Sequence, residues 1–182
     1  MKKIKTFFLK NKDNLALVTN EIDPENMWVL ETGYATRKFD GSACAIIDGK
    51  LYKRYDAKKG KKVPEGAIPC QEADSVTGHH PHWVKCKPDN PGDKYFWEAY
   101  DKEKLEDGTY ELIGEKVQGN PEKIVGHKLV RHGEEIYTFK DFSYGFLKQF
   151  LEDNDIEGIV FHDANPTGNM CKIRKSDYAI KR

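Results

Sequence analysis

The stretch RKFDGSACAIIDGKLYKRY, residues 37–55, decides the local fold around which the rest of this chain can be interpreted. It holds two strand-like runs on either side of Asp48-Gly49, a dipeptide that suits a type I′ turn because both positions tolerate a positive φ. The pattern therefore predicts a β-hairpin over residues 42–55. Lys38 lies just before this hairpin, so the fold would hold its side chain at the entry to a strand.

Outside the hairpin the sequence predicts more strands than helices. One helix is strongly indicated, with Asp141 or Ser143 as its N-cap and Asn154 at its end. Its apolar stripe repeats every three to four residues and comprises Phe142, Phe146, Leu147, Phe150 and Leu151. Strands are predicted over residues 4–9, 14–22, 95–100, 109–117, 128–130, 136–139, 158–162 and 170–174. The expected fold class is α+β, mainly antiparallel sheets with two or three helices.

Length and composition favour one domain over residues 1–182, which is enough chain for a substantial core. Residues 56–94 stand apart because they hold five of the eight prolines and show little periodicity. Apolar side chains such as Val76 and Trp83 give this segment something to bury, and a structureless loop of this length is unusual inside a domain. We therefore expect a long ordered excursion.

Thirty basic and thirty acidic residues cancel at pH 7, so no global positive field attracts a polyanion. Nucleic acid would have to meet a local patch. One such patch comprises Lys53, Arg54, Lys58, Lys59, Lys61 and Lys62. Phosphate contacts there would make binding salt-dependent, and the alternative is a flexible, solvated loop.

The cysteines and the N-terminal sequence indicate an intracellular protein. The four cysteines are widely spaced, with no CxxC pair, and give no disulfide framework. The apolar run near the N-terminus is too short for a signal peptide, and no segment approaches transmembrane length. We expect a cytoplasmic monomer with no membrane partner.

Two cations near the C-terminus form a candidate phosphate site. Residues two apart on a strand share a face, so Lys172 and Arg174 would point to one side while Cys171 and Ile173 turn toward the core. Arginine can bind a phosphate through two parallel hydrogen bonds. Such charges also favour the neutral amine that a nearby lysine nucleophile needs. The alternative is a solvated basic face on an edge strand.

Glu115 and Glu157 are the candidate metal ligands, because each adjoins a glycine and an apolar strand. Carboxylates in such positions can bind Mg²⁺ or a ribose hydroxyl. Mg²⁺ or Mn²⁺ would offset the charge that builds on a transferring phosphoryl group. The alternative for both residues is an exposed charge at the end of an element.

The segment from Cys70 to Cys86 contains usual zinc ligands, including His79, His80 and His82. Their spacing matches no common zinc pattern. Ordinary packing or substrate contact is therefore the preferred interpretation.

Five motifs in sequence resemble those of the covalent nucleotidyltransferases, the superfamily of ATP-dependent RNA ligases, DNA ligases and mRNA capping enzymes. They are Lys38-Phe39-Asp40-Gly41, Arg54, Glu111-Leu112-Ile113-Gly114-Glu115, Glu157-Gly158-Ile159-Val160 and Lys172-Ile173-Arg174. Details such as Thr77-Gly78-His79 and Trp83-Val84 resemble the small 5′–3′ RNA ligase family of animals, viruses and phages. The resemblance runs from about residue 27 to residue 178.

This resemblance implies a nucleotidyltransferase (adenylation) domain and a ligase that joins RNA ends, as in RNA repair. Lys38, in one catalytic motif with Asp40 and Gly41, would attack the α-phosphorus of ATP and hold AMP. The AMP would move to an RNA 5′-phosphate, and a 3′-hydroxyl would displace it. Lys172 and Arg174 would hold and polarise the α-phosphate.

The resemblance also implies the remaining ligands. Arg54 would contact the ribose or the incoming 5′-phosphate, Glu115 the ribose, and Glu157 the metal ion. Tyr137 or Phe139 would stack on adenine, with His132 as a weaker choice. The alternatives are a DNA ligase, a capping guanylyltransferase, or a catalytically silent RNA-binding module.

Two positions depart from the family pattern. Arg37 stands where RNA ligases often have Glu, which leaves its role open. Arg174 stands where many relatives have Lys. The arginine keeps the positive charge but cannot act as a proton donor near neutral pH. The sequence ends eight residues after Arg174, so we expect the catalytic domain without an OB-fold domain.

Overall fold

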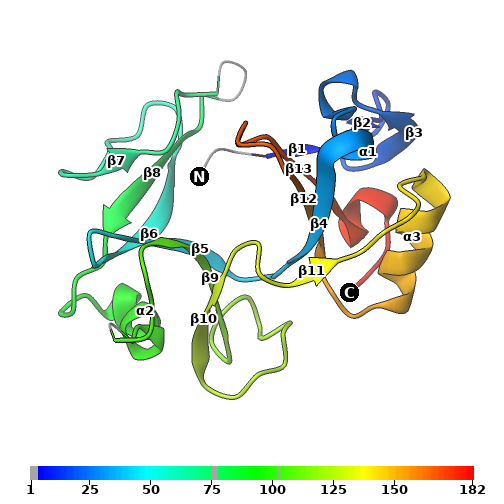
Figure 1. The fold of residues 1–182 in the computed structure, drawn as a ribbon. Coiled ribbons are helices and arrows are strands. Elements are labelled where there is room, and N and C mark those ends of the chain that lie inside the picture. The colour runs from blue at the N-terminus through cyan, green and yellow to red at the C-terminus, as the bar shows by residue number, and fades with distance from the viewer. Residues whose placement is uncertain (1–3, 75–77, 102) are drawn as a thin grey trace. The chain divides into compact units, whose positions relative to one another are not determined.

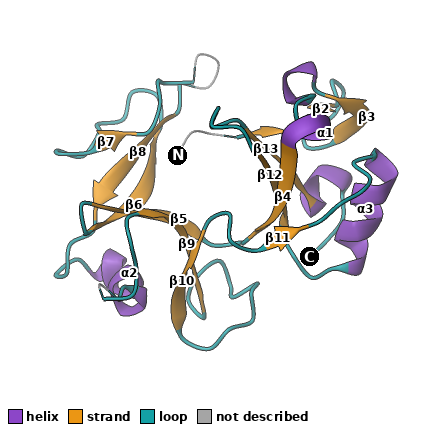
Figure 2. Ribbon diagram, in the orientation of Figure 1, coloured by secondary structure: helices purple, strands orange, loops and turns teal. Residues whose placement is uncertain are grey.

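The computed structural model describes residues 4–74, 78–101 and 103–182. In this part of the chain it is an α+β structure with three α-helices and mostly antiparallel sheets, which confirms the predicted class (Figure 2). The chain divides into two compact units. The Lys38 unit comprises Ile4–Phe39 and Gly133–Arg182, and the inserted unit comprises Asp40–His132. A single domain over residues 1–182 stays a prediction.

The Lys38 unit is built on a five-stranded sheet with the order β1-β13-β12-β4-β11, beside a separate β2-β3 pair. All pairings in the five-stranded sheet are antiparallel except that of β1 with β13. The strands of the Lys38 unit are β1 (Lys5–Thr6), β2 (Phe8–Lys10), β3 (Val18–Ile22), β4 (Gly33–Lys38), β11 (Ile136–Tyr137), β12 (Gly158–Asp163) and β13 (Met170–Arg174). Its helical elements are η1 (Pro24–Asn26), α1 (Val29–Thr32), α3 (Tyr144–Asp153) and η3 (Lys175–Tyr178).

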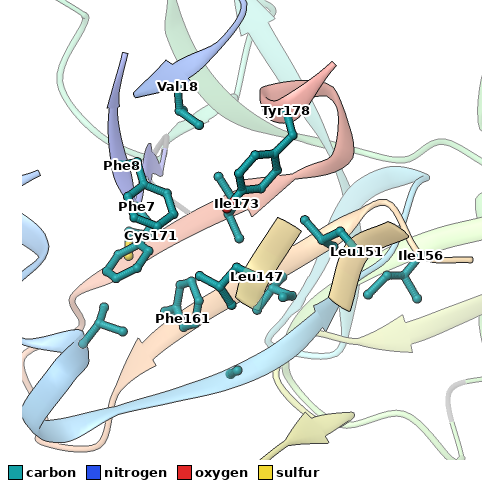
Figure 3. Packing of buried hydrophobic residues seen from close by; sticks show 13 residues of the cluster. Phe7, Phe8, Val18, Leu147, Leu151, Ile156, Phe161, Cys171, Ile173 and Tyr178 are labelled. Carbon is teal, nitrogen blue, oxygen red and sulfur yellow. The ribbon is translucent and has the colours of Figure 1, made fainter. Parts of the chain in front are cut away.

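The five-stranded sheet of the Lys38 unit has one apolar face. Helix α3 packs on this face (Figure 1), with Leu147 and Leu151 completely buried against the strands. Figure 3 shows the cluster between α3, β12 and β13. The residues that β4, β12 and β13 contribute to it are Ala35, Ile159, Phe161, Cys171 and Ile173, each at most 1% exposed. The predicted inward orientation of Cys171 and Ile173 is confirmed.

Helix α3 begins and ends where the sequence predicts. The Ser143 hydroxyl accepts a hydrogen bond from the backbone N–H of Phe146 at 3.3 Å, which satisfies one of the free donors of the first turn. Asp141 instead accepts hydrogen bonds from the backbone and hydroxyl of Ser143. Asn154 is the C-cap. Ser143 is therefore the N-cap, and Asp141 supports it.

The inserted unit is a six-stranded antiparallel sheet with the order β10-β9-β5-β6-β8-β7. Its strands are β5 (Ser42–Ile47), β6 (Lys50–Ala57), β7 (Ile68–Pro69), β8 (His80–Lys85), β9 (Gly108–Gly114) and β10 (His127–Arg131). Its helical elements are η2 (Pro91–Asp93) and α2 (Lys94–Ala99). A second buried cluster, which includes Cys44, Leu51 and Leu112, forms its core.

The predicted hairpin over residues 42–55 is confirmed as β5 and β6. Asp48 and Gly49 have φ values of 50° and 64°, as a type I′ turn requires. The Asp107 carboxylate accepts hydrogen bonds from the backbone N–H groups of both turn residues, at 2.7 and 2.9 Å. The excursion over residues 56–94 is likewise ordered where it is described, because it contributes β7 and β8 to the sheet. Val76 and Thr77 lie outside the described residues.

The strand predicted over residues 95–100 is wrong, because this segment is helix α2. Its aromatic residues favour a strand by propensity, but the preceding turn starts a helix. Asn90 caps η2 by accepting from the backbone N–H of Gly92 at 3.0 Å, and Pro91 follows at the first helical position. Phe96 is then buried in the core of the inserted unit.

None of the helices in the described residues has both the length and the apolar composition needed to cross a membrane.

We predict opposite stability effects for two Gly-to-Ala substitutions in the Lys38 unit. A Cβ at Gly158 would lie 2.3 Å from the carbonyl oxygen of Ile173, so Gly158→Ala should lower the free energy of unfolding by about 1–3 kcal/mol. Gly145, within α3, has open space around it, so Gly145→Ala should raise the same quantity by about 0.5–1 kcal/mol. Urea unfolding of both variants measures these changes. If Gly158→Ala also raised the free energy of unfolding, the close packing at Gly158 would be contradicted.

Candidate functional site

Lys38 lies at the end of β4, and its ammonium forms an ion pair with the Glu157 carboxylate. The register of β4 and β12 produces this contact, because Lys38 is opposite Gly158 and Glu157 immediately precedes it. Both side chains are about one-fifth exposed, at 22% and 21%. The pair is thus held at the sheet and remains open to solvent.

Gly158 also lies opposite Arg174 on the other neighbouring strand, β13. Lys38 and Arg174 therefore flank β12 at the same level and on the same face of the sheet. A Cβ at Gly158 would lie 3.2 Å from Cγ of Arg174. The absence of a side chain at this position lets the two cations share the space above the strand.

Lys172 adds a third cation to this face. It lies opposite Val160, two residues along β13 from Arg174. Burial, followed by the charges of Arg174 and Lys38, lowers its pKa to about 8, against the opposing effects of Glu157 and Asp177. Lys38, Lys172 and Arg174 form what we call the cation cluster. An anion such as a phosphate would relieve the mutual repulsion in this cluster.

Arg174 is held in place by Asp177 of η3, whose side chain is completely buried. The carboxylate accepts hydrogen bonds from the backbone N–H of Arg174 at 2.9 Å and from Nη2 at 3.0 Å. Lys10 of β2 donates to the same carboxylate at 2.8 Å. Burial opposes ionisation of Asp177, but these hydrogen bonds outweigh it and lower its pKa. Asp177 thus fixes the direction of the Arg174 guanidinium.

Arg37 lies on the opposite face from Lys38, since neighbouring strand residues alternate. Its guanidinium contacts the Glu135 carboxylate at 3.4 Å and lies 4.6 Å from the centre of the Phe39 ring. Its backbone N–H donates to the carbonyl of Glu135 at 2.9 Å. An arginine is accommodated beside Lys38 because its side chain lies on the other face of the sheet. There Arg37 joins β4 to the segment that leads into β11.

Tyr137, a predicted adenine-binding residue, also lies on the apolar side of the sheet. It is opposite Ala35, which is buried, and its ring packs against Phe139 and Phe150 at 6.0 and 5.2 Å. Its hydroxyl donates to Glu135 at 2.9 Å. The residue of β11 on the same face as Lys38 is Ile136, which is 61% exposed.

The other predicted site residues belong to the inserted unit. The backbone N–H of Asp40 donates to the Glu122 carboxylate at 2.9 Å. Gly41 packs so closely on β9 that a Cβ would lie 2.2 Å from the carbonyl oxygen of Leu112. Arg54 lies opposite Trp83 of β8, and its Nε donates to Asp56 at 3.2 Å.

Glu115 and Glu111 occupy different environments on and after β9. Glu115 is exposed beyond the end of the strand. Glu111 is 9% exposed and bonds Nε2 of His132 at 2.8 Å, while Nδ1 of His132 bonds the Thr109 hydroxyl at 3.0 Å. Our sequence reasoning did not select Glu111 as a site residue. The sequence does hold a signal that Glu111 is paired. This carboxylate lies inside an apolar strand, and a buried Glu is rare unless it has a partner.

The basic stretch in residues 53–62 is only partly a surface patch. Lys53 is ion-paired with Asp93, whose side chain is 1% exposed. Lys58, Lys59, Lys61 and Lys62 are exposed. These four lysines are the part of the patch open to a polyanion.

No group of three or more His, Cys, Asp or Glu side chains positioned for a metal ion occurs within residues 4–74, 78–101 and 103–182. In the segment considered for zinc, the rings of His80 and His82 pack at 4.2 Å, and Cys86 is buried. Nδ1 of His82 bonds the carbonyl of His80 at 2.8 Å. His82 therefore has a packing role.

No protein-family model matches this chain, and no curated protein matches it.

We expect Asp177→Asn to lower the free energy of unfolding by about 3 kcal/mol, because it leaves Arg174 and Lys10 without their buried counter-charge. The folded-state pKa of Asp177 is lowered, so its contribution is present above about pH 4 and is lost as the pH falls through the folded pKa. Urea unfolding from pH 2 to 7 should show the difference from the wild type shrinking in acid. A constant difference would contradict this, and Asp13→Asn, at an exposed position, is the control.

The Lys172 amine should titrate near pH 8, and Arg174→Gln should raise its pKa because one repelling charge is removed. ¹³C-methylation of the lysines followed by NMR titration measures this, with Lys172→Arg identifying the resonance. Lys172→Met should raise the free energy of unfolding at pH 7 by roughly 1–2 kcal/mol, since the folded state disfavours the ammonium. An unchanged Lys172 pKa in Arg174→Gln would show that the two side chains are not coupled.

Proposed function

We propose that this chain is an ATP-dependent RNA ligase that works through a covalent lysyl-AMP at Lys38. One observation carries the proposal: Lys38, Lys172 and Arg174 share one face of one sheet, with Glu157 in contact with Lys38. The order of motifs along the chain supports the same reaction class. Covalent catalysis by lysine needs an amine placed beside groups that can hold the phosphate it attacks.

In the first step the Lys38 amine would attack the α-phosphorus of ATP. A nitrogen–phosphorus bond forms, the bond to pyrophosphate breaks, and the nitrogen loses its extra proton to solvent, to which Lys38 is 22% exposed. Lys172 and Arg174 would neutralise the charge on the phosphate oxygens, where fixed cations act most strongly on the transition state. Asp177 would keep the Arg174 guanidinium aimed at them.

Lys172 and Arg174 would act differently. Lys172, whose pKa is lowered to about 8, can exchange a proton near neutral pH. Arg174 remains charged and serves as a fixed hydrogen-bond donor. This division supplies one group that can titrate and one that cannot.

Glu157 is the carboxylate of the Lys38 unit that fits a hydrated metal ion. Mg²⁺ commonly takes only one or two protein carboxylates, keeping waters and substrate phosphates as its other ligands. Mg²⁺ or Mn²⁺ would there offset charge on the transferring phosphoryl group. For the inserted unit, the family resemblance implies Arg54 and Glu115 as further nucleotide ligands.

We assign the adenine ring to Ile136 and Val160 rather than to Tyr137. Both lie opposite Thr36, on the two strands that flank β4 and on the same face as Lys38. Ile136 is 61% exposed and could pack against the flat face of the adenine ring. The AMP would then pass to an RNA 5′-phosphate, and a 3′-hydroxyl would displace it to join the strands.

Incubation with α-labelled ATP and Mg²⁺ should give a covalent label that acid releases. Lys38→Ala should abolish the label, and Lys172→Ala should slow its formation at least about 100-fold by removing one phosphate contact. Lys50→Ala, at the exposed turn of the hairpin, is the matched control and should label like the wild type. Absence of label in the wild type, or undiminished label in Lys38→Ala, would refute the proposal.

A further inference from the structure

Tyr34 and His162 form a stacked pair of rings on the same sheet face as the cation cluster. Their centres are 5.1 Å apart and their planes 16° from parallel. The two residues lie opposite each other on β4 and β12. Tyr34 is 37% exposed, so its ring presents an aromatic surface to solvent rather than filling the core.

Neighbouring polar contacts hold the His162 ring in position. Its Nε2 bonds the buried Thr36 hydroxyl at 2.9 Å. The next residue, Asp163, accepts hydrogen bonds from the hydroxyls of Thr32 and Thr167 at 2.8 and 2.6 Å, and these lower its pKa to about 2. The end of β12 is thereby tied to α1 and to the turn before β13. The ring pair is therefore preorganised.

The ring pair and the cation cluster lie at opposite ends of one strand face. Tyr34 and Lys38 are four residues apart on β4, a separation of about 13 Å along the strand. Lys172 lies between these levels on β13, opposite Val160. Cations at one end and an exposed aromatic surface at the other match the two parts of a single-stranded nucleic acid, its phosphates and its bases.

We propose that Tyr34 and His162 form a stacking platform for a nucleobase of the RNA end that is joined at Lys38. This inference rests on the proposed function, and it identifies a base-binding element of that site. Stacking on aromatic rings is tolerant of sequence, because every base has a flat π face. The platform would thus hold an RNA end in line with the cation cluster without selecting its sequence.

The discriminating experiment separates the first chemical step from RNA sealing. Variants Tyr34→Ala and Tyr34→Phe are compared in ATP labelling and in the ATP-independent joining of a 5′-adenylylated RNA to a 3′-hydroxyl acceptor. Tyr34→Ala should label normally and lose about 5- to 100-fold in kcat/KM for joining, mostly through KM. Tyr34→Phe keeps the ring and should stay within about twofold of the wild type.

A second measurement detects the stack itself. RNA that carries 2-aminopurine near its reacting end should show quenched fluorescence when bound to the wild type and to Tyr34→Phe, but not to Tyr34→Ala. Leu15→Ala, at a residue 71% exposed on the turn between β2 and β3, is the surface control. Thermal unfolding confirms that each variant is folded.

The outcomes are distinct. Equal joining by Tyr34→Ala and the wild type would overturn the platform, as would a parallel loss of ATP labelling in Tyr34→Ala. If the wild type takes no label, the ligase assignment fails. The fluorescence measurement is then the test of the platform. Quenching that requires the Tyr34 ring supports the platform, and no quenching in the wild type overturns it.

Discussion

The pairing of β12 with β4 on one side and β13 on the other is the constraint on which the Lys38 unit depends. Both registers meet at Gly158, which is opposite Lys38 and Arg174 at once. Side chains alternate between faces with a period of two, so a slip of one residue in either pairing would move a cation to the wrong side. The buried residues of the apolar face set these registers, because the same slip would expose Ile159 or Ile173.

The cation cluster costs folding energy that the surrounding structure must offset. Three cations on one face repel one another, and Lys172 is partly buried as well. Glu157 and Asp177 supply counter-charge in different ways. Glu157 is partly exposed and contacts Lys38, whereas Asp177 is fully buried and holds Arg174 through several hydrogen bonds. Glu157 is therefore placed where it can exchange partners, whereas Asp177 is fixed.

Sequence reasoning succeeded where local periodicity decided the structure. Alternation in β13 identified which of its residues are buried, the apolar stripe with Ser143 located α3, and Asp48-Gly49 located the hairpin. It failed at α2, where an Asn-Pro turn and burial of Phe96 overrode the strand propensity of aromatic residues. The face on which Tyr137 lies depends on its register with β4, a contact distant in sequence. The contact between Glu111 and His132 could not be predicted either, because His132 comes from beyond the next strand.

The two faces of the same sheet therefore have separable tasks. The apolar face, covered by α3, fixes the strand registers and contributes to the buried cluster of the Lys38 unit. The other face carries three pairs of residues in a definite order along β4 and β12: Lys38 with Gly158, then Thr36 with Val160, then Tyr34 with His162. Because a strand is stiff over four residues, this order sets the distance between charge and aromatic surface. A flexible loop could supply the same side chains, but it could not hold that spacing.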